Sequence, residues 1–151
     1  IAITGINEEA LAGRTQFKII IKNVGGGDII KDSAKEKCNP SGERITREDV
    51  DKVMLEWVKI ADKSLACGPF AEGESKGEKG IVRLINGEGF AICTLPKSEY
   101  QNANTAYTTP IAIKLSYAYR NTIEKKIQIR KEISGLGEGS KIPIEQQYGP
   151  Q

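Results

Sequence analysis

The chain has 151 residues, no histidine and a formal net charge of +2. This length fits one domain of ordinary size, and the small net charge gives no electrostatic basis for nucleic-acid binding. The lack of histidine excludes His-based catalytic triads, His general bases and His metal ligands. No apolar run approaches the roughly 20 residues that span a bilayer, so we expect no membrane span in this chain.

The N-terminal part alternates apolar and polar residues in two stretches. Residues 1 to 6, IAITGI, predict a short strand, and residues 7 to 13 predict a polar connection, so that 1 to 13 form an extended N-terminal segment. Residues 15 to 24, TQFKIIIKNV, predict a stronger strand. Its alternation puts three apolar side chains on one face: Phe17, Ile19 and Ile21.

A loop and an ambiguous apolar segment follow the glycines at 25 to 27 and the short apolar pair at 29 and 30. Residues 31 to 49 predict a surface loop. Residues 45 to 68 fit either a helix, because apolar residues recur at helical spacing, or a strand hairpin, because VMLEWVKI is β-branched and aromatic. We favour one helical turn at 46 to 50, with Thr46 and Asp49 as its cap. Strands are then predicted near 52–60 and 64–67.

Two further strand pairs are predicted in the C-terminal half. Residues 80 to 95, GIVRLINGEGFAICTL, predict a hairpin because the Asn-Gly pair at 86 and 87 favours a tight turn between two apolar runs. Residues 108 to 129 predict a final antiparallel pair that turns at 120 to 122. A glycine-rich extended segment is expected over 134 to 151. The buried face of the final pair is predicted to carry Ile111, Ile113, Leu115, Tyr117, Tyr119, Ile127 and Ile129.

These segments add up to about eight strands, one short helical turn and no long helix. Short strands separated by turn signals are typical of two antiparallel sheets packed face to face. The sequence therefore predicts an all-β protein, a single β-sandwich domain over residues 1–151.

Two segments carry a resemblance to a known family. FKIIIKNVGGGDI, at 17 to 29, resembles the strand and Asn-x-Gly turn of CARDB-type and related immunoglobulin-like modules. TTPIAIKLSYAYRNTIEKKIQI, at 108 to 129, resembles their last two strands, with a Thr-Pro entry and a Tyr-x-Tyr pattern. The resemblance implies an immunoglobulin-like antiparallel β-sandwich of the kind frequent in archaeal cell-surface and secreted proteins. Such modules mostly serve as spacers, adhesins or assembly units, so no catalytic residues are implied.

The three cysteines have no Cys-x-x-Cys spacing of the kind that metal and redox sites use. They fit two alternatives: small buried residues, or one disulfide and one free thiol, which is typical of an oxidising compartment. For a disulfide we favour Cys67 with Cys93, because both close apolar strands, and Cys38 with Cys67 is the second pairing. A nucleophilic cysteine is disfavoured because no histidine is present to activate it.

The sequence predicts no cofactor and no metal site. Residues 135 to 139, GLGEG, resemble a phosphate loop, but Pro143 leaves no room for the helix that would bind the phosphate. The acidic residues of the middle region do not have EF-hand spacing. Five aromatic residues could form a platform for sugars, although the last two could equally fill a core: Trp57, Tyr100, Tyr107, Tyr117 and Tyr119.

The expected function follows from the fold and from the lack of catalytic machinery. We expect no enzyme, but a non-catalytic structural or assembly module at the cell surface or outside the cell, self-associating as a surface, filament or pilus subunit. Its expected partners are copies of itself. The alternative is an adhesion module that binds a glycan or a surface protein.

Self-association is expected to use strand donation, in which one chain adds a strand to the open sheet edge of another. IAITGI has the required alternation, and its anchors would be Ile1, Ile3 and Ile6. The C-terminal segment offers Ile142 and Ile144, but the proline between them suits an edge less well. The alternative is a monomer whose first strand pairs within its own sheet.

Overall fold

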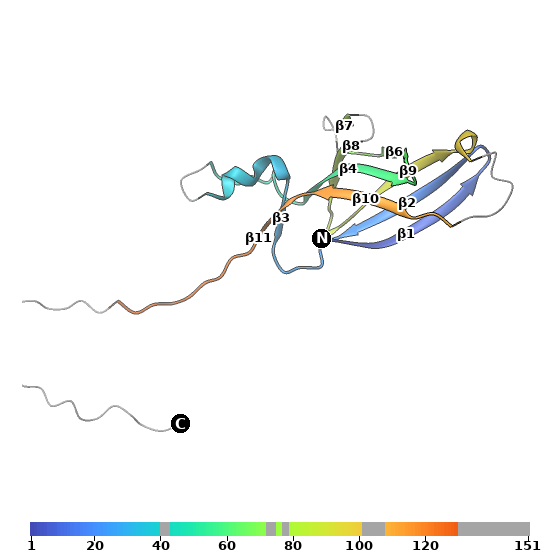
Figure 1. Ribbon diagram of the computed structural model, residues 1–151. Helices are drawn as coiled ribbons and strands as arrows, with labels where there is room; N and C mark the ends of the chain where they lie inside the picture. The colour runs from blue at the N-terminus through green and yellow to red at the C-terminus, as the bar shows by residue number, and fades with distance from the viewer. Residues whose placement is uncertain (40–42, 72–74, 77–78, 101–107, 130–151) are drawn as a thin grey trace, which may run out of the picture.

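The computed structural model describes residues 1–39, 43–71, 75–76, 79–100 and 108–129, with the backbone alone at 75–76 (Figure 1). They are mostly β, in two antiparallel sheets and a two-stranded ribbon. The first sheet has the spatial order β1 (Ala2–Leu11), β2 (Arg14–Lys22), β9 (Glu88–Pro96) and β6 (Ala66–Gly68). The second has the order β10 (Ile111–Ser116), β4 (Lys52–Ile60), β8 (Lys79–Arg83) and β7 (Ser75–Lys76), with β5 (Lys63–Ser64) beside β4. The ribbon pairs β11 (Ala118–Arg120) with β3 (Asp28–Ile30).

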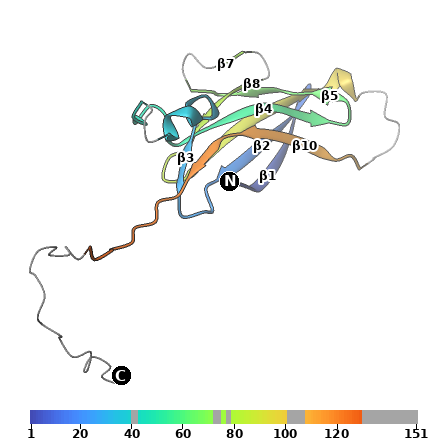
Figure 2. The same ribbon diagram turned by 60° about the vertical axis from the view of Figure 1, so that its left-hand side comes forward.

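The two sheets face each other across one hydrophobic core, in a sandwich-like arrangement (Figures 1 and 2). The alternation of β2 points Ile19 and Ile21 into this core, and both are fully buried. From the other sheet, β4 contributes Val53, Leu55 and Val58, which are also fully buried. Burial of each such side chain contributes about 1.5–3 kcal/mol, so this contact is what holds the sheets together.

The expected all-β class is confirmed as a mostly β structure with antiparallel sheets. Several predicted elements are also confirmed in detail. β2 falls on the predicted strand, and β4 has the predicted bounds 52–60. The strand alternative for 45–68 is therefore the correct one. The predicted second strand at 64–67 is divided, however: β5 pairs with β4, and β6 pairs with β9 in the first sheet. Before β4, the Asp49 N–H donates to the Thr46 carbonyl at 3.0 Å, which gives a single hydrogen-bonded turn. The immunoglobulin-like topology stays a prediction.

The predicted polar connection at 7–13 is wrong, because β1 continues to Leu11. The register runs from Ala2 opposite Lys22 to Leu11 opposite Arg14, with a bulge between Ile3 and Gly5. The backbone hydrogen bonds of this long pairing outweigh the weak strand propensity of the polar residues.

The predicted hairpin at 80–95 is only partly correct. Asn86 and Gly87 have φ angles of 53° and 78°, and a bridge joins Ile85 to Glu88, so the tight turn is present. Beyond it the two strands separate: β8 pairs with β4 in the second sheet, while β9 pairs with β2 in the first. Each apolar run lies in a different sheet and contributes to the shared core from opposite sides.

The predicted loop at 31–49 contains a 3₁₀ helix, η1 (Asp32–Cys38), and a second one, η2 (Lys97–Glu99), follows β9. Ala34 is buried on η1, with 1% of its surface exposed. This single apolar contact, together with the polar cluster described below, accounts for an ordered segment where the sequence is almost entirely polar.

The predicted return strand after residue 122 is wrong. β11 ends at Arg120, and residues 121–129 contain no strand. Both views show this part of the chain running away from the body of the protein (Figures 1 and 2). The predicted segment 134–151, with Ile142 and Ile144, lies outside the described residues.

Candidate functional site

The outer edge of β1 leaves part of the core exposed. β1 is the last strand of its sheet. Ile6 lies opposite Ile19 and Ile3 lies opposite Ile21. Residues directly opposite each other share a face, so Ile3 and Ile6 point inward. They are nevertheless 38% and 39% exposed, which means that the core reaches solvent along this strand.

The edge strand of the other sheet lies on the same side. Both views place β10 alongside β1 and β2 (Figures 1 and 2). The inward-facing side chains of β10 pack against the core but are only partly buried, and so is that of Ile1. We call this region the open side and define it by Ile1, Ile3, Ile6, Ile111, Ile113 and Leu115.

Residues 121–129, which we call the exit segment, expose three isoleucines. Ile123, Ile127 and Ile129 are 87%, 73% and 86% exposed. Single exposed apolar residues are common on protein surfaces. These three occupy odd-numbered positions, which share one face of an extended strand, and nothing in the domain described here covers them. The exit segment therefore has the pattern of a strand without a sheet.

A clasp fixes the chain where the exit segment begins. The Tyr119 hydroxyl accepts a hydrogen bond from the Gly27 N–H at 2.8 Å. The Arg120 guanidinium donates to the Asp28 carboxylate at 2.6 and 3.1 Å. A side chain at position 27 would overlap the Tyr119 ring, so glycine is needed there for the close approach. The clasp sets the direction in which the chain leaves the domain.

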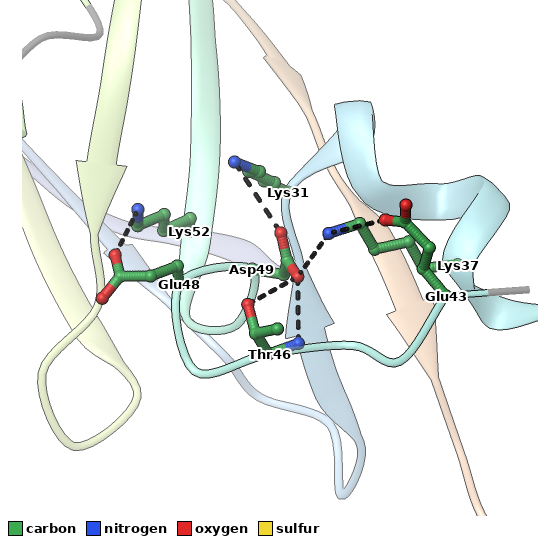
Figure 3. Close-up of polar contacts among 7 residues, drawn as sticks. All are labelled: Lys31, Lys37, Glu43, Thr46, Glu48, Asp49 and Lys52. Atoms are coloured by element: carbon green, nitrogen blue, oxygen red, sulfur yellow. Dashed lines mark hydrogen bonds and ion pairs between the residues drawn. The ribbon is translucent and has the colours of Figure 1, made fainter.

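Figure 3 shows a polar cluster around the buried carboxylate of Asp49, which ties η1 to the start of β4. The side chain of Asp49 is 3% exposed. It accepts hydrogen bonds from the backbone N–H and the hydroxyl of Thr46, both at 2.9 Å. It also accepts one from Lys37 at 3.1 Å and pairs with Lys31 at 3.7 Å.

The Asp49 carboxylate has a structural role. The backbone N–H of Thr46, then its hydroxyl, and Lys37 hold the pKa of the Asp49 carboxyl well below its usual range, although burial acts in the opposite direction. A general base needs a pKa near the working pH. With its oxygens already occupied by donors, this group is suited to holding the loop.

Cys67 and Cys93 form a disulfide, which confirms the favoured pairing. They lie opposite each other on β6 and β9, so the bond joins neighbouring strands of the first sheet. Cys38 is an exposed free cysteine at the end of η1. The alternative pairing of Cys38 with Cys67 is thus wrong.

The aromatic residues proposed as a sugar platform lie on separate elements. Trp57 is on β4 with Lys59 over its ring, Tyr100 bonds to Thr15 at 3.0 Å, and Tyr119 belongs to the clasp. Tyr107 lies outside the described residues. Tyr117, between β10 and β11, is 37% exposed. The sugar platform stays a prediction.

A ligand or a metal ion could also bind elsewhere in the part of the chain that the structure describes. A shallow hollow of about 320 Å³ is lined by Arg47, Val50, Asp51, Arg83, Leu84 and Ile85. Within the same ranges, no three acidic, cysteine or histidine side chains are grouped so as to hold a metal ion. None of the helices described is long and apolar enough to cross a membrane.

No family model, curated protein or solved structure matches this chain. The candidate site therefore depends on geometry alone. It consists of the open side, which includes three residues predicted as assembly anchors, and of the exit segment, which sequence reasoning placed inside the fold. A signal for the latter was present: residues 120–122, Arg-Asn-Thr, lack the glycine or proline that favours a tight reversal.

Proposed function

We propose that this protein is a non-catalytic, immunoglobulin-like structural module that assembles with copies of itself by strand addition. The observation that carries the proposal is the exit segment with its three exposed isoleucines. In strand addition, main-chain hydrogen bonds supply affinity, and alternate apolar side chains supply register. The exit segment offers both to a neighbouring sheet.

The strand predicted as the donor does not need a second chain. β1 pairs with β2 of its own chain along its whole length, so an exchange would first break that pairing. The exit segment has no such pairing to break. We therefore assign the donor role to residues 121–129 and not to IAITGI.

A comparison of the free energy of isoleucine burial with the cost of association shows that the exit segment needs a sheet as its partner and not a loose apolar contact. Full burial of an isoleucine stabilises by about 1.5–3 kcal/mol, and association costs about 4–15 kcal/mol in lost freedom. Three isoleucines alone would offset only part of that cost. A continuous ladder of hydrogen bonds and contact with further apolar surface are needed as well.

We also propose that the module works at the cell surface or outside the cell. Its Cys67–Cys93 disulfide supports this location, because such bonds persist in oxidising compartments and are rare in the cytosol. A structural role fits that setting, because a protein there must stay folded under changing conditions.

Sedimentation velocity and electron microscopy of the full chain over a range of concentrations test the proposal. The wild type is expected to form oligomers, and Ile127→Lys with Ile129→Lys is expected to leave monomers. The matched control is Thr122→Lys with Gln128→Lys, which adds the same charge on the other face of the segment and should still assemble. Monomers of the wild type at every concentration, or unchanged assembly of the Ile127/Ile129 variant, would refute the proposal.

A further inference from the structure

We propose that the exit segment of one copy adds, antiparallel, to the outer edge of β1 in a second copy, with Ile127 opposite Ile6 and Lys125 opposite Glu8. This inference rests on the proposed self-assembly and names the site that receives the strand. The acceptor is then the open side.

The dimensions of the two partners agree. β1 is ten residues long and ends its sheet, so its outer edge can take a further strand. The exit segment has nine residues and reaches about 30 Å when extended. β10, the other edge on the open side, is six residues long and has its own irregularity after Lys114.

The faces also agree in this register. Ile6 and Glu8 lie opposite Ile19 and Phe17 and therefore share the inward face of β1. On the exit segment, Ile127 and Lys125 share one face in the same way. Placing Ile127 beside Ile6 brings Ile129 to the bulge next to Ile3, so the isoleucines of the segment continue the exposed part of the core.

One charge pair also fits the outer edge of β1. β1 carries two acidic residues, Glu8 and Glu9, both exposed. The exit segment carries Glu124 and the adjacent pair Lys125 and Lys126. Opposite charges across neighbouring strands stabilise a pair and like charges destabilise it. In the proposed register Lys125 faces Glu8 on the inward face, which is favourable, while Glu124 faces Glu9 on the outward face, which is not. The length of β1 and its inward isoleucines therefore select it over β10, and the Glu8–Lys125 pair fixes the register.

Strand direction indicates that the donor is a second chain. β1 runs from the end of the molecule where Ala2 lies opposite Lys22, the exit end, to the turn between Leu11 and Arg14, the far end. The exit segment leaves from the exit end (Figure 1). If it folded back along its own β1, it would run parallel to that strand. The antiparallel register, in which Lys125 faces Glu8, is available only from another copy.

Complementation between two variants tests this acceptor. The acceptor variant is Ile6→Lys with Glu8→Lys, and the donor variant is Ile127→Lys with Ile129→Lys. Each alone is expected to stay monomeric, because each lacks one half of the contact. Mixed, they should give heterodimers and nothing larger, since one intact donor and one intact acceptor remain.

The matched control is Glu9→Lys with Leu11→Lys. It makes the same two kinds of change at the same spacing on the same strand, but on the outward face, where Leu11 is 37% exposed. It should assemble at least as well as the wild type, because the lysine at position 9 would face Glu124 of the added segment. Normal assembly of the Ile6/Glu8 variant would overturn the acceptor and leave the proposed self-assembly intact, whereas a monomeric wild type would overturn both.

Charge reversal gives a second test that does not depend on changes to the core. Glu8→Lys and Lys125→Glu are exposed single substitutions, and each should weaken assembly about fivefold. Combined in one chain they restore an opposite pair, so assembly should recover. If the double variant is as weak as the sum of the single ones, Glu8 and Lys125 do not face each other and the register is wrong.

Discussion

Asp49→Asn is the sharpest test of the loop between β3 and β4. Asparagine keeps the shape of the side chain and one oxygen that accepts a hydrogen bond from Thr46, but it removes the charge. Hydrogen bonds to a charged group contribute about 1.5–3 kcal/mol each. Lys31 and Lys37 are 23% and 29% exposed, so their loss counts for less than a buried pair would. We expect unfolding to become easier by about 2–3 kcal/mol at pH 7.

The same substitution predicts a dependence on pH. Because the folded-state pKa of Asp49 is lowered, the unfolded chain takes up the proton first as the solution is acidified. The contribution of Asp49 to stability is therefore complete above the ordinary carboxyl pKa of about 4. It is lost as the pH falls toward the lower, folded-state value. The asparagine variant has no such group and should lack this part of the acid sensitivity.

Guanidinium unfolding of both proteins, followed by circular dichroism at several pH values between 7 and 2, measures the effect. The difference in unfolding free energy should shrink steadily below about pH 4. Asp62→Asn is the control, because Asp62 is exposed in the turn after β4, and its effect should stay within about 0.5 kcal/mol. A wild-type advantage over Asp49→Asn that is equal at pH 7 and pH 2.5 would refute the role assigned to the carboxylate.

Two further predictions concern the sheets. Replacing Cys67 and Cys93 by alanine removes a crosslink between residues with a sequence separation of 26. Thermal melting should then show that the free energy of unfolding falls by about 3–4 kcal/mol. Alkylation of the native protein should label Cys38 alone. Gly80→Ala places a methyl group within the ring of Phe70. Chemical unfolding should therefore show that the free energy of unfolding falls by about 1–3 kcal/mol. Unchanged stability would mean that the ring moves aside freely.

Local alternation in the sequence predicts strands well where a strand has one buried face. β2 is the clearest case, since the pattern puts Phe17, Ile19 and Ile21 on one face, and all three lie in the core or against it. The order of strands is harder to predict. The Asn86–Gly87 turn indicates two adjacent strands in one sheet. The strands on either side of it instead pair with others, β8 with β4 and β9 with β2. Those partners are distant in sequence, so no local signal selects them.

The η1 loop and the exit segment could not be predicted for related reasons. The sequence pairs Asp49 with Thr46, but the contacts of Asp49 with Lys31 and Lys37 depend on the fold of η1, whose sequence is polar apart from Ala34 and Cys38. In the exit segment, Ile127 and Ile129 carry the alternation of a buried strand, although both are exposed in this domain. A pattern that predicts burial, on a segment that its own domain leaves exposed, is itself the signal for a partner.

The direction of the proposed strand addition decides what kind of assembly is expected. In the antiparallel register the exit segment enters at the far end of its neighbour's β1 and runs toward the neighbour's exit end. The exit end of each copy then meets the far end of the next, and the neighbour's own exit segment is free to continue. Such a head-to-tail contact repeats without closing and produces a filament. A parallel register would bring two exit ends together and close a dimer. Sedimentation of the wild type should therefore show a ladder of species that lengthens with concentration, and a single dimer that stays unchanged at high concentration would mean that the strand is added the other way round.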